Sequence, residues 1–160
     1  MKFNLFVNYD PAPKLERDRI AVLVRRIVRD NRKNADIINV ILVNDNYLSD
    51  VNRKFLNHTY KTDVISFDLG ESEIIDGEIY ISVDRAKVQA RRYKIPLERE
   101  ILRLIIHGAL HLVGLEDKTP SEKLRMRKRE NTFIQDFYRK SAAMPSMSSK
   151  RNVSGENGIT

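Results

Sequence analysis

Two histidines and a nearby carboxylate have the residue types and spacing to bind a metal ion. His107 and His111 lie four residues apart in the otherwise apolar run IIHGALHLVG. On an α-helix, side chains at this spacing share one face, so both rings can bind one ion from the same direction. Glu116 and Asp117 follow in the short link LEDK, and either carboxylate could reach that end of the helix. The pattern His107, His111, Asp117 predicts a three-ligand zinc site whose fourth position is free for water.

Other interpretations of the same run stay open. A histidine in a core helix, even one of an i, i+4 pair, is often a structural residue that only needs a hydrogen-bond partner. A peptidase of the His-Glu-x-x-His class is not expected, because Gly108 stands where that class has its general base. A glycine inside a helix costs about 1 kcal/mol relative to alanine, so Gly108 indicates close approach by another backbone or by substrate.

The elements that position these residues follow from the hydrophobic periodicity. Strands are expected at 3–7, 37–43, 62–69 and 77–83, the last two joined by an acidic link at 70–76, and helices at 15–31, 44–57, 84–94, 97–113 and 119–139. This order predicts one α+β domain over residues 1–140, α/β-like in its layers, with a mixed four-stranded sheet covered by about five helices. Residues 141–160 are rich in serine and turn formers and predict a disordered tail.

The helix ends near the histidines carry their own signals. Pro96 is expected to open the helix that holds both rings, and Gly114 stands where a left-handed cap would end it. Thr119 and Glu122 form a capping-box pattern at the start of the next helix. These signals predict a short, well-defined link that carries the candidate carboxylates.

The composition limits the partners and the ligands. The formal net charge of +7 favours polyanionic partners, although the same basic residues could simply form solvated helix faces. The chain has no cysteine, so a metal must be held by His, Asp or Glu. No run approaches the roughly 18 apolar residues that a bilayer requires, and the N-terminus lacks a long apolar signal core. We therefore expect a cytoplasmic protein without a membrane partner.

The histidine run resembles the signature of a known family, the bacterial YbeY proteins, which are rRNA maturation factors and endoribonucleases. That signature, His-Gly-x-Leu-His-Leu-x-Gly-Tyr-Asp-His, agrees with HGALHLVG over its first eight positions. The likeness continues through TDVISF at 62–67, GEIYIS at 77–82 and the pair Met126 and Glu130, and so covers roughly 3–139. On the last helix we expect Glu130 to make a structural hydrogen bond.

The resemblance implies a cofactor, an activity and partners. The family's three histidines are zinc ligands, so His107 and His111 imply one zinc ion here, although another divalent metal could replace it. The run HGALHLVG implies a single-strand-specific, metal-dependent endoribonuclease of late 16S rRNA 3′-end maturation and ribosome quality control. Its partners would be RNA of the small ribosomal subunit and ribosomal or ribosome-assembly proteins.

Two departures from the family bear on catalysis. Asp117 stands where the family has its third histidine, and Glu116 where it has the preceding aspartate. Aspartate is an acceptable zinc ligand, but it makes the ligand set harder and more anionic. A loop arginine of the family is also missing, because residues 58–61 read HTYK and Lys61 is the only substitute. Lysine keeps the charge but loses the planar fork that grips a phosphate at two points.

The residues around that loop are candidates for contact with RNA. The resemblance implies phosphate contact and catalysis by Lys61, proton acceptance by Glu116, and RNA contacts by Arg53, Asn57 and His58. Ordinary surface charge or turn hydrogen bonds would explain these residues as well. Two other functions stay open: a ribosome-associated RNA-binding maturation factor with a largely structural metal and little cleavage, and a metal-dependent hydrolase of a small substrate.

Overall fold

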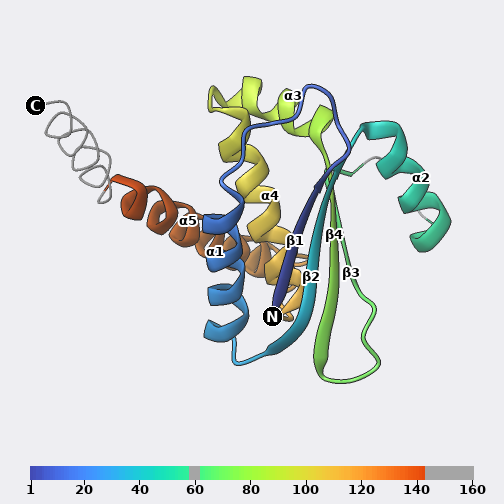
Figure 1. Ribbon diagram of the computed structural model, residues 1–160, viewed down its shortest axis with the longest axis vertical. Helices are drawn as coiled ribbons and strands as arrows, with labels where there is room; N and C mark the ends of the chain where they lie inside the picture. Colours follow the sequence, from blue (N-terminus) through green and yellow to red (C-terminus); the bar gives the residue numbers. More distant parts are fainter. Residues whose placement is uncertain (58–61, 143–160) are drawn as a thin grey trace, which may run out of the picture.

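Four strands and five helices make up the described part of the chain. The computed structural model describes residues 1–57 and 62–142. In chain order the elements are β1 Lys2–Val7, α1 Arg17–Asp30, β2 Asn34–Val43, α2 Asp45–Leu56, β3 Val64–Asp68, β4 Ile74–Ser82, α3 Val83–Tyr93, α4 Leu97–Leu112 and α5 Pro120–Ala142 (Figure 1). Their order is the predicted one. The prediction of one α+β domain with a four-stranded mixed sheet is confirmed.

The sheet has the strand order β1-β2-β4-β3. Strands β1, β2 and β4 run parallel, and β3 pairs antiparallel with β4 at the edge. One row of the sheet places Leu5, Val40, Ile79 and Ser66 opposite one another. Because side chains alternate along a strand, this row faces a single side of the sheet.

Strands β2 and β4 both begin earlier than the hydrophobic pattern predicts, and their added residues pair with each other. Asn34 lies opposite Ile74, and Ala35 lies opposite Ile75. The expected link at 70–76 therefore contributes its last three residues to β4. The parallel ladder supplies their hydrogen bonds, and Ile75 is buried in the core, so tertiary pairing extends both strands beyond the predicted starts.

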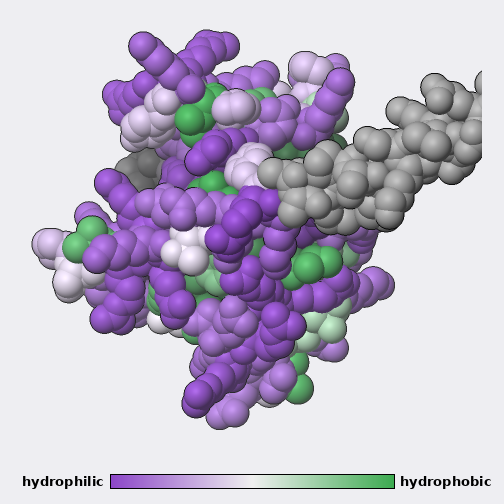
Figure 2. Space-filling model, turned by 90° about the vertical axis from the view of Figure 1, so that its left-hand side faces the viewer, coloured by the Kyte–Doolittle hydropathy of each residue, from purple (hydrophilic) through white to green (hydrophobic). Residues whose placement is uncertain are grey.

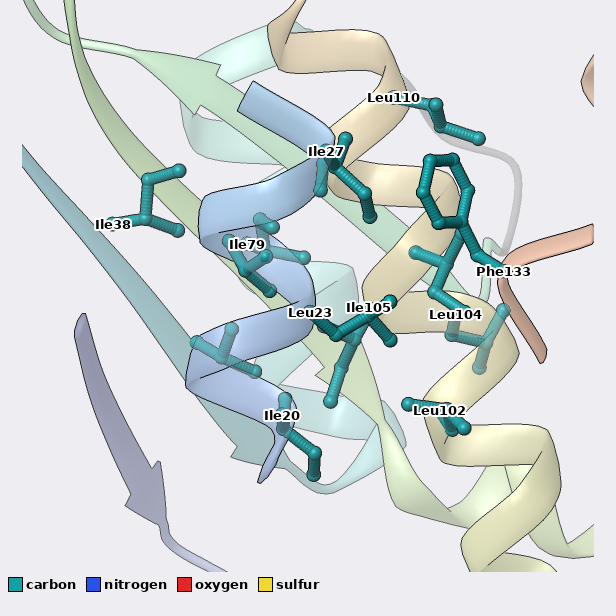
Figure 3. Packing of buried hydrophobic residues seen from close by; sticks show 14 of the residues in the cluster. Ile20, Leu23, Ile27, Ile38, Ile79, Leu102, Leu104, Ile105, Leu110 and Phe133 are labelled. Carbon is teal, nitrogen blue, oxygen red and sulfur yellow. The ribbon is translucent and has the colours of Figure 1, made fainter. Parts of the chain in front are cut away.

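The main core lies between the sheet and helices α1, α4 and α5. Figure 3 shows Ile20, Leu23 and Ile27 of α1 and residues of α4 packed over Ile38 and Ile79 of the sheet. A smaller cluster joins Ile41 and Val43 of β2 to Leu48 and Val51 of α2 on the opposite face of the sheet. Strand β2 is thus buried on both faces, as its continuous apolar run predicts.

Helix α4 is the most buried helix and has well-defined ends. Pro96 is its N-cap, and Gly114 follows its C-terminus with φ of 105°. The N–H of Leu115 donates to the Leu110 carbonyl at 3.0 Å, which ends the helix in a left-handed turn. At the start of α5, Thr119 and Glu122 form the predicted capping box, with bonds of 2.9 and 3.2 Å. The link that carries Asp117 is therefore held at both ends.

The last helix extends further than the periodicity predicts, to Ala142. The predicted tail beyond it, 143–160, lies outside the described residues. None of the helices described is long and apolar enough to cross a membrane.

Candidate metal centre

The three predicted ligands meet at the C-terminal end of α4. The Nε2 atoms of His107 and His111 are 3.0 Å apart, and Oδ2 of Asp117 lies 3.4 Å from each of them. Two atoms bonded to zinc at about 2.0–2.1 Å in a tetrahedron are separated by about 3.3–3.4 Å. The three donor atoms therefore already have nearly the spacing of three corners of a zinc site. Within residues 1–57 and 62–142, they form the one such group of metal-binding side chains.

Hydrogen bonds on the far side of each ring determine which nitrogen faces the site. Nδ1 of His111 donates to the Leu115 carbonyl at 2.9 Å, because a carbonyl can only accept. Nδ1 of His107 donates to Oε2 of Glu130 at 2.6 Å. Both Nε2 atoms therefore present lone pairs to the same point. Facing lone pairs repel each other, whereas a bound cation attracts both, so this donor set fits a zinc ion.

The site is only partly covered. The side chains of His107, His111 and Asp117 are 17%, 31% and 35% exposed. His111 lies in the last turn of α4 and Asp117 in the link that follows, so the cluster is at the negative end of the helix dipole, which favours a cation. Such partial exposure leaves room for water or substrate to approach from the solvent side.

The structure brings Asp117, the carboxylate predicted as the third ligand, to the two histidines. Asp117 belongs to the ligand cluster, whereas Glu116 is exposed and lies outside it. Glu116 thus remains next to the site in sequence without contributing a ligand atom.

Gly108 has a different role from the one that its sequence position indicates. We expected close approach by another backbone or by substrate, and this expectation is wrong. A Cβ at position 108 would lie 2.6 Å from Cγ2 of Ile79 and 2.9 Å from Oγ of Ser66. The Ser66 hydroxyl also donates to the Gly108 carbonyl at 3.1 Å. The glycine lets α4 lie close against β3 and β4, and this contact positions the histidines.

A polar stripe on α4 continues from the two histidines toward the start of the helix. Glu100, Arg103, His107 and His111 are spaced by three or four residues and share one face. Glu130 of α5 is 4% exposed and makes the hydrogen bond that we predicted for it, with His107 as its partner. Sequence reasoning missed both Arg103 and Glu100. The signal was their spacing from His107 in a helix that is otherwise largely apolar.

Burial and neighbouring charges shift the pKa values of the ionisable groups along this stripe. Desolvation raises the pKa of Glu100, although the hydrogen bond and charge of Arg103 oppose the shift. Burial of Arg103 acts to lower its pKa, but Glu100 and Glu130 outweigh it, and the pKa of the guanidinium lies above its ordinary value. Arg103 therefore stays charged and compensates two buried carboxylates.

The predicted RNA-contact residues lie around the segment 58–61. His58 and Lys61 fall outside the described residues, so their predicted roles are not tested. Arg53 is exposed and forms an ion pair with Asp50 one helical turn away. Asn57 ends α2 in a left-handed conformation with φ of 54°, a position that suits asparagine. The RNA contacts assigned to Arg53 and Asn57 stay predictions.

Comparison with known proteins places this chain in a family. A family model described as Endoribonuclease YbeY matches residues 6–138. The chain belongs to this YbeY family. It is 40% identical over 115 residues to a protein of Flavobacterium psychrophilum named Endoribonuclease YbeY, covering 72% of this chain and 82% of that protein. The same name is given to a Phocaeicola vulgatus protein, 35% identical over 122 residues, with 76% and 88% of the two chains covered.

A solved structure has a similar fold. The solution structure of TM1509 from Thermotoga maritima superposes with a TM-score of 0.61 at 26% sequence identity. The match covers 91% of this chain and 95% of that one. The shared fold thus extends over nearly the whole of both proteins.

Proposed function

We propose that this protein is a metal-dependent endoribonuclease that cuts single-stranded RNA during late 16S rRNA 3′-end maturation and ribosome quality control. The observation that carries the proposal is the His107, His111, Asp117 cluster, with donor atoms 3.0 to 3.4 Å apart. Membership in a family of proteins named endoribonucleases supports RNA as the substrate. The protein would then work in the cytoplasm, on the small ribosomal subunit and beside ribosomal or assembly proteins.

Different residues of the candidate site would bind the metal, accept a proton and hold the phosphate. A zinc ion bound there would supply a Lewis acid that stabilises negative charge on a phosphoryl oxygen or acidifies a water. His107 and His111 offer neutral donors through Nε2, and Asp117 offers a negative one. Glu116, exposed and one residue away, is the candidate to accept the proton of the attacking water. Lys61 is the candidate to hold the phosphate next to the bond that breaks.

The surface charge fits a polyanionic substrate. The chain carries 29 Lys and Arg against 22 Asp and Glu. Figure 2 shows that the helical side of the molecule is covered mainly by hydrophilic residues, with hydrophobic ones scattered among them. Each phosphate that a protein neutralises on a single strand steepens the salt dependence of binding by about 0.7 in log K against log salt. Binding of an unstructured RNA should therefore weaken strongly as salt rises.

The partial exposure of the metal cluster favours an enzyme over a maturation factor with a purely structural ion. Structural zinc sites usually have four protein ligands, whereas catalytic sites keep one position open. In the described part of the chain the cluster offers three protein ligands. The missing family arginine supports the opposite view, because Lys61 replaces a bidentate phosphate contact with a single one.

The decisive experiment measures zinc content and cleavage of a ribosomal RNA precursor in parallel. We expect His111→Ala and Asp117→Ala to lose zinc and cleavage together, and chelation of the wild type to abolish cleavage. Glu116→Ala should keep zinc and lose most of its cleavage. The matched control is Glu71→Ala, which removes an exposed carboxylate of the β3–β4 link and should change neither quantity.

Three results would each contradict a different part of the proposal. Full zinc and full cleavage in Asp117→Ala would remove Asp117 from the ligand set. A wild-type protein that holds zinc and binds the precursor, yet leaves it uncut, would instead indicate an RNA-binding maturation factor. A flat salt response of RNA binding would favour a hydrolase of a small substrate.

A further inference from the structure

A buried carboxylate behind the metal cluster has two different partners. Glu130 accepts from Nδ1 of His107 with Oε2, at 2.6 Å, and from Nη1 of Arg103 with Oε1, at 3.2 Å. Its side chain is 6% exposed, so water has little access to replace either partner. With one oxygen used on each side, the rotation of this carboxylate is determined by Arg103 as much as by His107.

Arg103 is itself held by three helices. Its Nε donates to Glu100 on α4, Nη1 donates to Glu130 on α5, and Nη2 donates to Oε1 of Gln89 on α3 at 3.4 Å. Gln89 in turn donates to Oδ2 of Asp63 at 2.9 Å, just before β3. A planar guanidinium can reach three such acceptors at once, whereas the ammonium group of a lysine cannot reproduce the fork.

We propose that Arg103 is a positioning residue of the metal centre: it fixes the carboxylate of Glu130, which holds the His107 ring so that Nε2 faces the ion. The inference rests on the proposed metal site and deepens it. Partners of this kind commonly set the tautomer and orientation of a metal-bound histidine, and their loss weakens binding about 10- to 100-fold. The link through Gln89 to Asp63 further connects the metal centre to the base of the segment 58–61.

The test compares two substitutions that keep the positive charge but replace the planar guanidinium with an ammonium group. Arg103→Lys disrupts the network, whereas Arg99→Lys changes an exposed arginine four residues earlier on the same helix. Zinc affinity is measured without RNA, by competition with a chromophoric chelator, and the Nδ1–H of His107 is followed by NMR. We expect Arg103→Lys to bind zinc about 10- to 100-fold more weakly and to lose the protected Nδ1–H signal. Arg99→Lys should stay within about twofold of the wild type, since the guanidinium of Arg99 lies over the ring of Tyr138, 5.1 Å from its centroid, and not on Glu130.

A double-mutant cycle shows whether Arg103 acts through Glu130. Glu130→Gln keeps the shape but gives up a charged acceptor, and it should weaken zinc binding by itself. If Arg103 acts through Glu130, adding Arg103→Lys to this variant changes the zinc affinity no further. The cycle also covers the case in which Arg103→Lys alone fails to fold, because the Glu130→Gln background leaves one buried carboxylate fewer for Arg103 to compensate.

The possible outcomes separate this inference from the proposed function. Native zinc affinity in folded Arg103→Lys, or a further loss of affinity in the double variant, would overturn the positioning role alone. Failure of the wild type to bind zinc would overturn the metal site and the inference together. Failure of the wild type to cut RNA would leave the zinc measurements, and the role of Arg103 that they test, unaffected.

Discussion

Oε2 of Glu130 lies 2.6 Å from Nδ1 of His107, although the two residues are 23 positions apart in the sequence. This contact joins α5 to α4 beside the metal cluster. Because the carboxylate accepts the Nδ1 proton, the lone pair of Nε2 is directed toward His111 and Asp117. The last helix is therefore part of the candidate metal centre, even though none of its described residues belongs to the ligand cluster.

The charge of Asp117 should matter for zinc affinity. Asp117→Asn keeps the shape but replaces a carboxylate with a weaker amide ligand, so we expect zinc to bind at least about tenfold more weakly. Asp117→His recreates the three-histidine set that the family resemblance implies and should retain zinc. Competition titrations measure both. The control is Glu116→Gln, the same chemical change one residue earlier, for which unchanged zinc affinity is expected. Wild-type affinity in Asp117→Asn would show that the carboxylate is not a ligand.

Lys61 gives a prediction that rests on the sequence, since it lies outside the described residues. Lys61→Arg restores a planar fork that can hold a phosphate at two points, and we expect faster cleavage of single-stranded RNA. Lys61→Met should lower RNA affinity and reduce the salt slope by about 0.7, as for the loss of one phosphate contact. Cleavage rates and binding at several salt concentrations measure the effects. An unchanged salt slope in Lys61→Met would remove this residue from the RNA contact.

Gly108→Ala should destabilise the protein despite the higher helix propensity of alanine. The propensity gain is about 1 kcal/mol, whereas overpacking of a dense core typically costs about 1–3 kcal/mol. The new Cβ would meet Ile79 at 2.6 Å, so we expect a net loss of about 1 kcal/mol in urea unfolding.

The origin of that loss can be checked with a second substitution. Ile79→Ala removes the methyl group that the new Cβ would meet, so the double variant should lose less stability than the sum of the two single variants. Strict additivity would place the cost of Gly108→Ala somewhere other than this contact.

An ion pair between α1 and α5 predicts a pH-dependent contribution to stability. Arg26 donates to Asp136 at 2.8 Å, and this hydrogen bond is the largest cause of the lowered pKa of Asp136. The pKa in the folded state lies below the unfolded value of about 3.9, so the stabilisation is complete above about pH 5. It is lost as the pH falls through about 4 toward the folded pKa.

Unfolding of wild type and Asp136→Asn across this pH range measures the effect. We expect the wild type to be more stable by about 1 kcal/mol between pH 5 and 7, with the difference shrinking at lower pH. Asp18→Asn, at a 97% exposed partner of Arg17, should change little at any pH. A constant difference between wild type and Asp136→Asn down to pH 3 would rule out the ionised carboxylate as its source.

The sequence by itself determined the elements and the ligand pair. Apolar residues at 2.0- and 3.6-residue periods predict the order of strands and helices, because each element must bury one face. The spacing of His107 and His111 predicts a shared face because it depends only on helix geometry. The helix caps at Gly114 and Thr119 could also be predicted from the sequence, because they depend on hydrogen bonds between residues close together in the chain.

Only the tertiary structure decided which distant groups complete the site. It brought Glu130 to His107 and placed Arg103 between two buried carboxylates. It also showed that Gly108 makes room for the side chains of β3 and β4. These relations depend on how α4 packs against the sheet and α5. Periodicity within one segment cannot specify such contacts, because they join residues that are far apart along the chain.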